Sequence, residues 1–244
     1  MQNEIEITQC GIRVALIVSI SEEAMKRTAS IYGFPIRLHL RSDLHLARKA
    51  WHMMMGLVVA FAYWGGVSKT TAIIILSVVF TFDLFVETMR LRSPSFNEKI
   101  MKVWGPIMRS CEMHRMSAVP HYLLASILAI AIFPKAVAVL SILYLACGDP
   151  VASLFGVLYG HKSIRFSSGK TLIGTLAGVL VCVAISILFL KALYLPSGTV
   201  LVISLVGGLA GGVTELIPFE VDDNFTIPMV SGFVLWLAFL LAGI

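Results

Sequence analysis

The chain has 244 residues, of which 58% are hydrophobic and only 14% carry a charged side chain. Soluble proteins average about 45–50% apolar and about 25% charged residues, so a soluble domain of this length has too little interior to bury this much apolar surface. The composition excludes a soluble enzyme, a disordered chain and a coiled coil, and it predicts an integral membrane protein. The net charge of +5 does not indicate nucleic-acid binding, because the basic residues lie between long uncharged stretches.

Residues 1–47 precede the first uncharged stretch, and we expect them to form an N-terminal cytoplasmic or membrane-surface segment. Within this segment, residues 12–32 have the pattern either of an amphipathic helix lying on the membrane or of a plain cytoplasmic helix. Both alternatives stay open. Residues 48–244 are expected to form a single transmembrane domain.

Seven stretches of that domain contain no Asp, Glu, Lys or Arg: 50–68, 70–82, 116–134, 136–148, 171–190, 192–214 and 224–244. Five of them are 19 to 23 residues long, close to the roughly 20 residues with which a helix crosses a bilayer. The two shorter ones stop at Asp83 and Asp149, and apolar sequence resumes after each acid. We therefore expect an all-α fold of about seven transmembrane helices, with an interfacial helix within residues 93–117 between spans two and three.

The charged residues predict the orientation of the spans. Sixteen of the nineteen Lys and Arg residues fall on one side of the membrane if the chain crosses it seven times. The positive-inside rule then places the N-terminus in the cytoplasm and the C-terminus on the opposite side. All fourteen acids lie in the same cytoplasmic segments or in the cytoplasmic halves of spans. This asymmetry favours a site for a polyanion and a metal at the cytoplasmic face, although acids that neutralise neighbouring bases are the alternative.

Asp149 lies at an expected break in the fourth span. Pro150 removes one backbone donor, and Gly148 weakens the helix beside it. Broken helices inside membranes are tolerated where they line a cavity, so we expect Asp149 to face a polar pocket. A proline kink with a hydrogen-bonded aspartate is the alternative.

The loop that follows is rich in glycine and lysine. Its Ser168-Gly-Lys-Thr171 stretch looks like the end of a phosphate-binding P-loop, but Ile164 occupies the position of the first glycine of that motif, and a membrane span follows. The loop is therefore not a P-loop. Glycines still let backbone amides approach phosphates, and Lys162 and Lys170 supply positive charge.

Four carboxylates gather before the last span, at Glu215, Glu220, Asp222 and Asp223, with no Lys or Arg nearby in sequence. Without a cation they would repel one another, and hard oxygen ligands suit Mg²⁺, which usually takes one or two carboxylates together with substrate phosphates. Acids solvated in an exposed loop are the alternative.

A fourth set of polar residues flanks the first two spans. Arg48, Lys49 and His52 begin span one, and the helical spacing of Asp83, Glu87 and Arg90 puts the latter three on one face where span two ends. We expect a substrate-binding or supporting role for this set, although an ordinary salt bridge explains the trio of Asp83, Glu87 and Arg90 about as well.

These motifs resemble those of the CTP-dependent lipid kinases, a family that includes yeast-type diacylglycerol kinase, dolichol kinase and phytol kinase. The resemblance runs over about residues 45–235 and is carried by GDPVASLFGVLYG, by Lys162 with GKTLIGTLAG, and by TELIPFEVDDNFTIPMVSG. Phosphatidate cytidylyltransferases are more distantly similar, since their C-terminal signature is absent here. The resemblance implies CTP as donor and a lipid hydroxyl as acceptor, and it points to these residues: Gly148, Asp149, Gly156, Gly160, Lys162, Lys170, Thr171, Gly174, Glu215, Asp222, Asp223 and Asn224.

Roles for these residues follow from the needs of phosphoryl transfer, which are mainly charge neutralisation and alignment. We expect Asp222 and Asp223, with Asp149 as a third candidate, to hold Mg²⁺. Lys162 and Lys170 would bind phosphate oxygens, and the remaining family positions would complete the nucleotide site. Asp149 or Glu215 would orient or deprotonate the lipid hydroxyl, with Asp149 favoured because it lies deeper.

Two other classes remain open: a cytidylyltransferase, which releases pyrophosphate from CTP, and a small transporter. Among lipid acceptors the motifs favour diacylglycerol, with a polyprenol or phytol as alternatives. The bilayer, its lipid substrate and CTP are the expected partners, no nucleic acid is expected, and the oligomeric state stays open.

Overall fold

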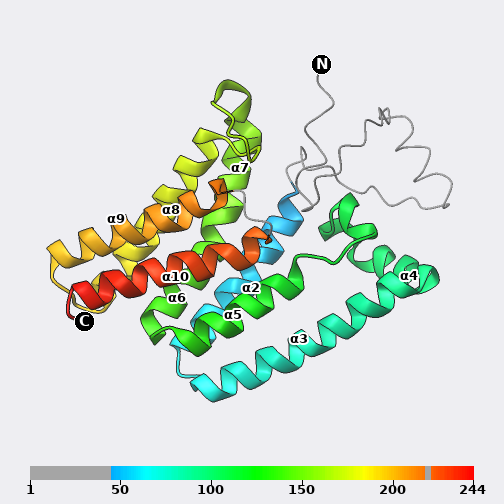
Figure 1. The fold of residues 1–244 in the computed structure, drawn as a ribbon, viewed down its shortest axis with the longest axis horizontal. Coiled ribbons are helices and arrows are strands. Elements are labelled where there is room, and N and C mark those ends of the chain that lie inside the picture. Colours follow the sequence, from blue (N-terminus) through cyan, green and yellow to red (C-terminus); the bar gives the residue numbers. More distant parts are fainter. Residues whose placement is uncertain (1–44, 218–220) are drawn as a thin grey trace.

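The computed structural model describes residues 45–217 and 221–244, and this part of the chain contains helices but no β-strand (Figure 1). The prediction of an all-α fold is thereby confirmed for the described residues. The N-terminal helix expected at residues 12–32 lies outside them, and the expected division at residue 47 stays a prediction.

The helices follow the uncharged stretches of the sequence. In chain order they are α2 (Leu46–Trp64), α3 (Lys69–Arg92), α4 (Pro94–Trp104), α5 (Val119–Ile132), α6 (Lys135–Leu143), α7 (Asp149–Tyr159), α8 (Leu172–Ala192), α9 (Ser197–Val213) and α10 (Asp223–Leu241). A π-helical turn, Tyr144–Gly148, joins α6 to α7 without interrupting the rod. The fourth predicted span therefore does continue past Asp149, as expected.

Five helical segments of the described chain are long and apolar enough to cross a membrane. They are Lys69–Arg92, Lys135–Lys162, Leu172–Ala192, Ser197–Leu216 and Asp223–Leu241. The other two predicted spans are helical as well, but α2 does not meet the same criterion and α5 has only 14 residues. Five spans are therefore supported by length and composition, and a total of seven stays a prediction.

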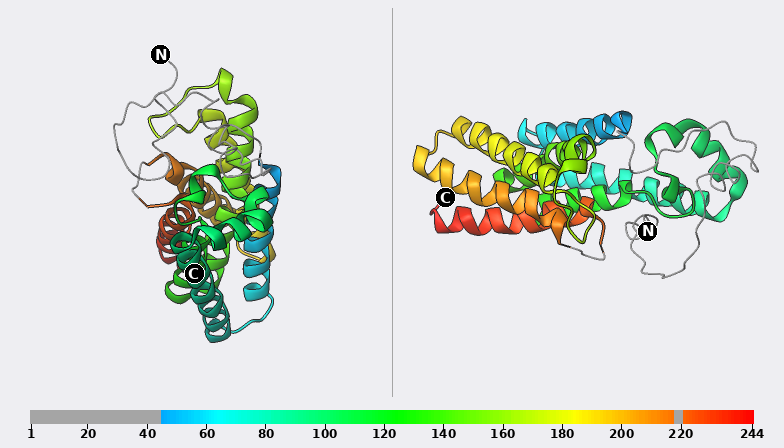
Figure 2. Two further views of the ribbon diagram at one scale, coloured as in Figure 1. Left: turned by 90° about the vertical axis from the view of Figure 1, so that its right-hand side faces the viewer. Right: turned by 90° about the horizontal axis from the view of Figure 1, so that it is seen from above.

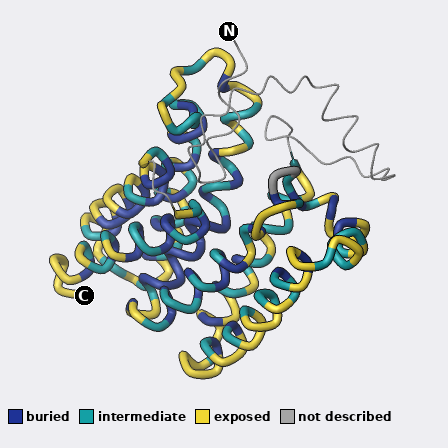
Figure 3. Tube along the Cα trace, turned by 45° about the vertical axis from the view of Figure 1, so that its right-hand side comes forward, coloured by how far each residue is buried: buried dark blue, intermediate teal, exposed yellow. Residues whose placement is uncertain are grey.

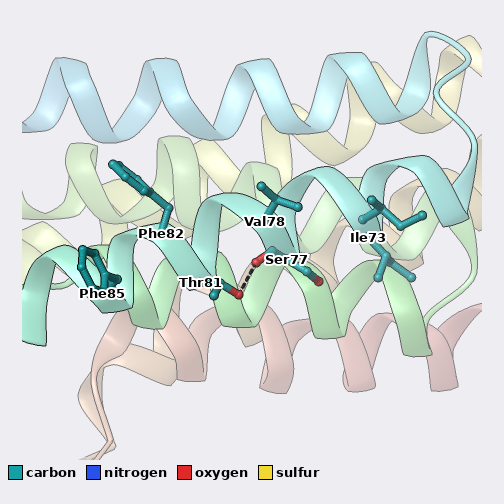
Figure 4. Close-up of a pocket in the computed structure, with 7 residues that line it drawn as sticks. Ile73, Ser77, Val78, Thr81, Phe82 and Phe85 are labelled. Atoms are coloured by element: carbon teal, nitrogen blue, oxygen red, sulfur yellow. Dashed lines mark hydrogen bonds between the residues drawn. The ribbon is translucent and has the colours of Figure 1, made fainter.

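The rod formed by α6, the π-helical turn and α7 is the central element of the bundle. In its most apolar 18-residue stretch 72% is buried, whereas in that of α3 only 17% is buried. α6 packs against α2, α5, α8 and α10, while α3 packs mainly on α5 at the periphery (Figures 2 and 3). A shallow groove of about 650 Å³ runs along the outer face of α3 and is lined by Ile73, Ser77, Val78 and Phe82, among others (Figure 4). This apolar face suits hydrocarbon, and it carries no charged group.

The segment between α3 and α5 contains a helix, as predicted, but a shorter one. α4 begins at Pro94, where Ser93 caps it, and it ends at Trp104 because Gly105 and Pro106 start a 3₁₀ turn instead. A second 3₁₀ turn, Ser110–Met113, follows. That α4 lies in the membrane interface stays a prediction.

Lysines and aromatic rings meet at the end of the bundle where α2 leads into α3 and α5 into α6. The Lys135 ammonium lies 5.3 Å from the ring centroid of Tyr63 and 5.7 Å from that of Trp64. Lys69 Nζ donates a hydrogen bond to the Ala131 carbonyl oxygen at 2.7 Å. Aromatic and basic side chains of this kind are typical of a membrane–water interface.

Glycines let α8 and α9 approach closely. A Cβ atom on Gly208 would lie 2.8 Å from the backbone nitrogen of Val183, and one on Gly212 would lie 2.7 Å from that of Val179. Backbone cannot move aside as a flexible side chain can, so any larger residue would separate the two helices. This contact holds the ends of α8 and α9 side by side.

We therefore predict that Gly212→Ala destabilises the protein by about 1–3 kcal/mol, the usual effect of overpacking. Gly198→Ala is the matched control, because a Cβ atom there meets no atom within 4 Å. Thermal unfolding of both variants in detergent checks this, and equal midpoints would contradict the packing argument.

Candidate active site

The ammonium group of Lys170 lies between two carboxylates from distant parts of the chain. Its Nζ atom donates hydrogen bonds to Glu215 Oε2 and to Asp223 Oδ2, both at 2.9 Å. Lys170 precedes α8, Glu215 lies in the 3₁₀ turn after α9, and Asp223 begins α10. The glycine-rich loop and the acidic segment therefore meet in one polar cluster at one end of the bundle.

A tight turn places Lys170 in this cluster. Gly169 has a φ of 78°, in the left-handed region that glycine adopts without steric conflict. The Gly169 N–H donates to the Phe166 carbonyl, and the Phe166 N–H donates to the Lys170 carbonyl, each at 2.9 Å. Thr171 then caps α8, since its Oγ1 accepts the Gly174 N–H at 3.2 Å. The Ser-Gly-Lys-Thr stretch therefore builds a turn and a helix cap.

Glu215 is almost fully buried, with 4% of its surface exposed. Thr175, which sequence analysis did not identify, donates from Oγ1 to Glu215 Oε1 at 3.3 Å. Its only sequence signal is its position four residues after Thr171, which puts both hydroxyls on one face of α8. Both oxygens of Glu215 are therefore engaged by the protein itself.

Three carboxylates determine the charge state of Lys170. Burial alone would lower the pKa of its ammonium group, but Asp223, Glu215 and Asp149 together raise that pKa well above its usual range. Lys170 is therefore a fixed positive charge at neutral pH.

Asp149 lies where the π-helical turn ends and α7 begins. Lys170, His52, Arg109 and Arg48 all lie within electrostatic reach of its carboxylate. The π turn and Pro150 change the helix locally here, but the rod continues through them, so the break predicted from the sequence is only a local irregularity. Within residues 45–217 and 221–244 no hydrogen bond reaches the Asp149 side chain, so its interactions there are electrostatic.

Asp222 and Asn224 organise the start of α10. Asp222 Oδ1 accepts the backbone N–H of Asn224 at 2.9 Å and also binds the Asn224 side-chain amide. Asp222 is therefore the N-cap of the helix, and only its Oδ1 takes part in these bonds. Within residues 45–217 and 221–244, no three His, Cys, Asp or Glu side chains form a ready-made metal site, and the expected Glu220 falls outside these ranges.

The glycines that sequence analysis assigned to the nucleotide lie where α7 packs against α8 and against Thr171, which precedes α8. A Cβ atom on Gly148 would lie 2.6 Å from Cys182 Sγ, and one on Gly174 would lie 2.6 Å from the Ala152 carbonyl oxygen. A Cβ atom on Gly160 would lie 2.6 Å from Thr171 Cγ2, and one on Gly156 would lie 3.1 Å from Thr171 Oγ1. Helix packing alone accounts for glycine at these positions. Lys162 is exposed in the turn after α7, and a role of any of these residues in nucleotide binding stays a prediction.

The first turn of α2 points toward the same end of the bundle. Arg48 forms a two-pronged ion pair with Glu112, whose two oxygens each accept a hydrogen bond at 2.9 Å. His52 Nε2 donates to the Leu145 carbonyl oxygen of the π-helical turn at 3.2 Å. Lys49 lies within electrostatic reach of Asp149. These three predicted residues therefore border the region of Asp149, and Glu112 is a partner that sequence analysis missed.

Glu87 and Arg90, in contrast, serve the fold. Arg90 is 1% exposed, and its guanidinium donates to both oxygens of Glu87 and to the backbone carbonyls of Glu112 and Arg115, the latter two at 2.7 Å. These bonds hold the 3₁₀ segment against α3 and occupy the guanidinium. Asp83 lies one turn earlier, and its buried Oδ2 has no hydrogen-bond partner in the described part of the chain.

Comparison with known proteins places the chain in a family. It is 32% identical over 234 residues to "CTP-dependent diacylglycerol kinase 1" of Eremothecium gossypii, with 85% of this chain and 74% of that protein covered. Proteins of the same name from Saccharomyces cerevisiae and Schizosaccharomyces pombe are 29% and 26% identical, over 76% and 79% of this chain and 70% and 92% of their own lengths. No protein-family model and no solved structure matches the chain.

The fold and the polar cluster describe a helical membrane protein with a charged site at one end of its bundle. The similarity shows that the chain belongs to the family of CTP-dependent diacylglycerol kinases, which are lipid kinases. The resemblance recognised in the sequence motifs is thereby confirmed.

We predict that Lys170→Met destabilises the protein by about 3 kcal/mol or more, because it leaves the buried Glu215 carboxylate without its cation. Lys170→Met combined with Glu215→Gln should recover much of this loss, since the second change removes the unpaired charge. Lys102→Met is the control, because the ion pair of Lys102 with Glu98 is exposed to solvent. Thermal unfolding of the three variants in detergent measures this, and a double variant as unstable as Lys170→Met would refute the pairing.

Proposed function

We propose that this protein transfers the γ-phosphate of CTP to the hydroxyl group of a membrane lipid, with diacylglycerol as the favoured acceptor and polyprenols or phytol as alternatives. Membership of the family supports the donor and the reaction. The observation that carries the proposal within the structure is the Lys170 ammonium held between Glu215 and Asp223, close to the Asp149 carboxylate. A fixed cation beside carboxylates with free oxygens is what binding of a metal-bound triphosphate requires.

The acids at the start of α10 are suited to act as Mg²⁺ ligands. Only Oδ1 of Asp222 serves as the helix cap, and Asp223 has 38% of its side chain exposed, so both carboxylates have oxygens to offer. Mg²⁺ usually takes one or two carboxylates and completes its shell with water and phosphate oxygens, so a ready-made cluster of three acids is not needed. Asp149 is a third candidate ligand. The ion would neutralise charge on the triphosphate.

Lys170 and Lys162 are the proposed phosphate ligands on the protein. Lys170 carries its charge into the cluster, and Lys162 in the turn after α7 presents an exposed ammonium. Gly148, Gly156, Gly160, Thr171, Gly174 and Asn224 shape the helix ends around them. Together they would align the γ-phosphate rather than take part in covalent chemistry.

Asp149 is the better candidate for the group that orients or deprotonates the lipid hydroxyl. Both oxygens of Glu215 already accept hydrogen bonds, from Lys170 and Thr175. The π-helical turn places Asp149 inside the central rod, where a hydroxyl group arrives from the bilayer. We infer that Glu215 keeps Lys170 in place while Asp149 meets the acceptor.

The proposed orientation puts this end of the bundle in the cytoplasm. The starts of α2, α5, α8 and α10 and the ends of α3, α7 and α9 lie at the same end (Figure 1). The loops there carry most of the lysines and arginines of the sequence, in line with the positive-inside rule. CTP would then reach the site from the cytoplasm.

The test is an assay of purified protein in detergent with Mg²⁺ and CTP labelled at the γ-phosphate. Diacylglycerol, a polyprenol, phytol and phosphatidate are offered, with labelled ATP as a parallel donor. We expect label in phosphatidate made from diacylglycerol, CDP as by-product, and loss of turnover on chelation of Mg²⁺. Labelled pyrophosphate formed with phosphatidate would instead show a cytidylyltransferase, and substrate flux without nucleotide would show a transporter.

Asp223→Asn tests the metal assignment. We expect turnover to fall by about 100-fold or more, as when a group that stabilises transition-state charge is removed. Stability should change by less than about 1 kcal/mol, because the ion pair of Asp223 with Lys170 is partly exposed to solvent. Glu98→Gln, an exposed acid of α4, is the control. Near-normal turnover of Asp223→Asn would refute the assignment.

A further inference from the structure

Glu112 is the one acid of the segment between α3 and α5 that is buried in the described structure, with 5% of its surface exposed. Its carboxylate accepts two hydrogen bonds from the Arg48 guanidinium, and Oε2 also accepts the Arg109 backbone N–H at 2.9 Å. Burial alone would raise the pKa of Glu112, but the hydrogen bonds and charge of Arg48 lower it. Glu112 is therefore a fixed anion whose partner is Arg48.

The position of Glu112 is itself held firmly. Arg90, anchored at the end of α3 by Glu87, donates from Nη1 to the Glu112 carbonyl oxygen at 2.7 Å. The Arg109 backbone N–H donates to the Glu112 side chain, and this bond closes the 3₁₀ turn that contains Glu112. A chain of hydrogen bonds thus runs from α3 through Glu112 to the first turn of α2.

One edge of the Arg48 guanidinium makes no hydrogen bond within residues 45–217 and 221–244. Nη1 donates to Glu112 Oε2 and to the Ile107 carbonyl at 3.2 Å, and Nη2 donates to Glu112 Oε1. A guanidinium has five N–H donors, so the Nε–H and one Nη2–H have no acceptor in the described part of the chain. These two donors are parallel, which is the arrangement that binds two oxygens of one phosphate.

Arg48 itself borders the candidate active site. The carboxylates of Asp222 and Asp149 both lie within electrostatic reach of Arg48. A phosphate group between Arg48 and a Mg²⁺ ion held by the proposed acids would meet positive charge from both directions. The ion pair with Glu112 fixes the guanidinium, so that little side-chain entropy is lost when the phosphate binds.

We propose that Glu112 is a positioning residue, which holds Arg48 so that its Nε and Nη2 edge binds a phosphate of the nucleotide donor. This inference rests on the proposed function. It goes beyond it by giving Arg48 a phosphate ligand and Glu112 a role through Arg48.

Glu112→Gln is the main test, because glutamine keeps the size of the side chain but cannot accept both N–H groups as a carboxylate does. We expect the KM for CTP to rise about 10-fold or more, as for loss of a charge-assisted pair, while kcat and the KM for the lipid change less than about 3-fold. Binding of a non-hydrolysable CTP analogue, measured by calorimetry, should weaken by the same factor. Glu98→Gln, whose carboxylate forms an exposed ion pair on α4, should change none of these values.

A double-mutant cycle separates positioning from plain structural support. Arg48→Lys keeps the charge but loses the two-donor edge, so it should raise the KM for CTP as well. If Glu112 acts through Arg48, the double variant should be no worse than Arg48→Lys alone. Additive effects, an unchanged KM for CTP in Glu112→Gln, or an equal rise in the KM for lipid would overturn the inference.

Two further results keep the tests distinct. If Glu112→Gln fails to fold, Glu112→Asp with Arg48→Lys replaces it, and the same non-additivity is expected. If the unmodified protein neither binds the CTP analogue nor uses CTP, the proposed function fails, and the inference about Glu112 fails with it. If the unmodified protein uses CTP and the variants do not differ from it, only the inference about Glu112 fails.

Discussion

The end of the bundle that carries the site depends on one interaction, the Lys170 ammonium shared by Glu215 and Asp223. These residues stand at the ends of three different helices, α8, α9 and α10. An unpaired Glu215 carboxylate, which is almost fully buried, would cost several kcal/mol, so Lys170 stabilises the packing of the end of α9 against the start of α8. The Gly169 turn, the Thr175 hydroxyl and the close contact of α8 with α9 all serve to bring them together.

This interaction also gives the proposed chemistry its starting point. Lys170 is already held as a cation by two carboxylates, so the site does not have to acquire a positive charge when an anionic substrate arrives. The nucleotide phosphates and Mg²⁺ would exchange partners with groups that are already in place: phosphate with the ammonium, and metal with the acids at the start of α10. Catalysis by alignment of charge requires such preorganisation.

The sequence predicted the elements of the fold well, because runs without charge report directly on membrane helices. It also singled out Asp149, Lys170, Glu215 and Asp223, since buried charge is rare in such chains. Thr175 and Glu112 were missed because their partners lie 40 and 64 residues away, and no local pattern reports such pairs. The phosphate role of the glycines near Thr171 stays a prediction, and their tight contacts between helices appear only once the helices are packed.

The cation–π contact of Lys135 at the far end of the central rod has a consequence for how deep the chemistry lies. Lys135 and Asp149 are fourteen positions apart on one continuous rod, or about 20 Å at the rise of a helix. If the proposed orientation puts Lys135 at one surface of a hydrocarbon layer about 30 Å thick, Asp149 would lie about 10 Å below the other. At that level a lipid without a charged headgroup would place its hydroxyl at a lower energetic cost than a charged lipid would. Depth alone would thus admit neutral lipid alcohols and expel the phosphorylated product toward the water.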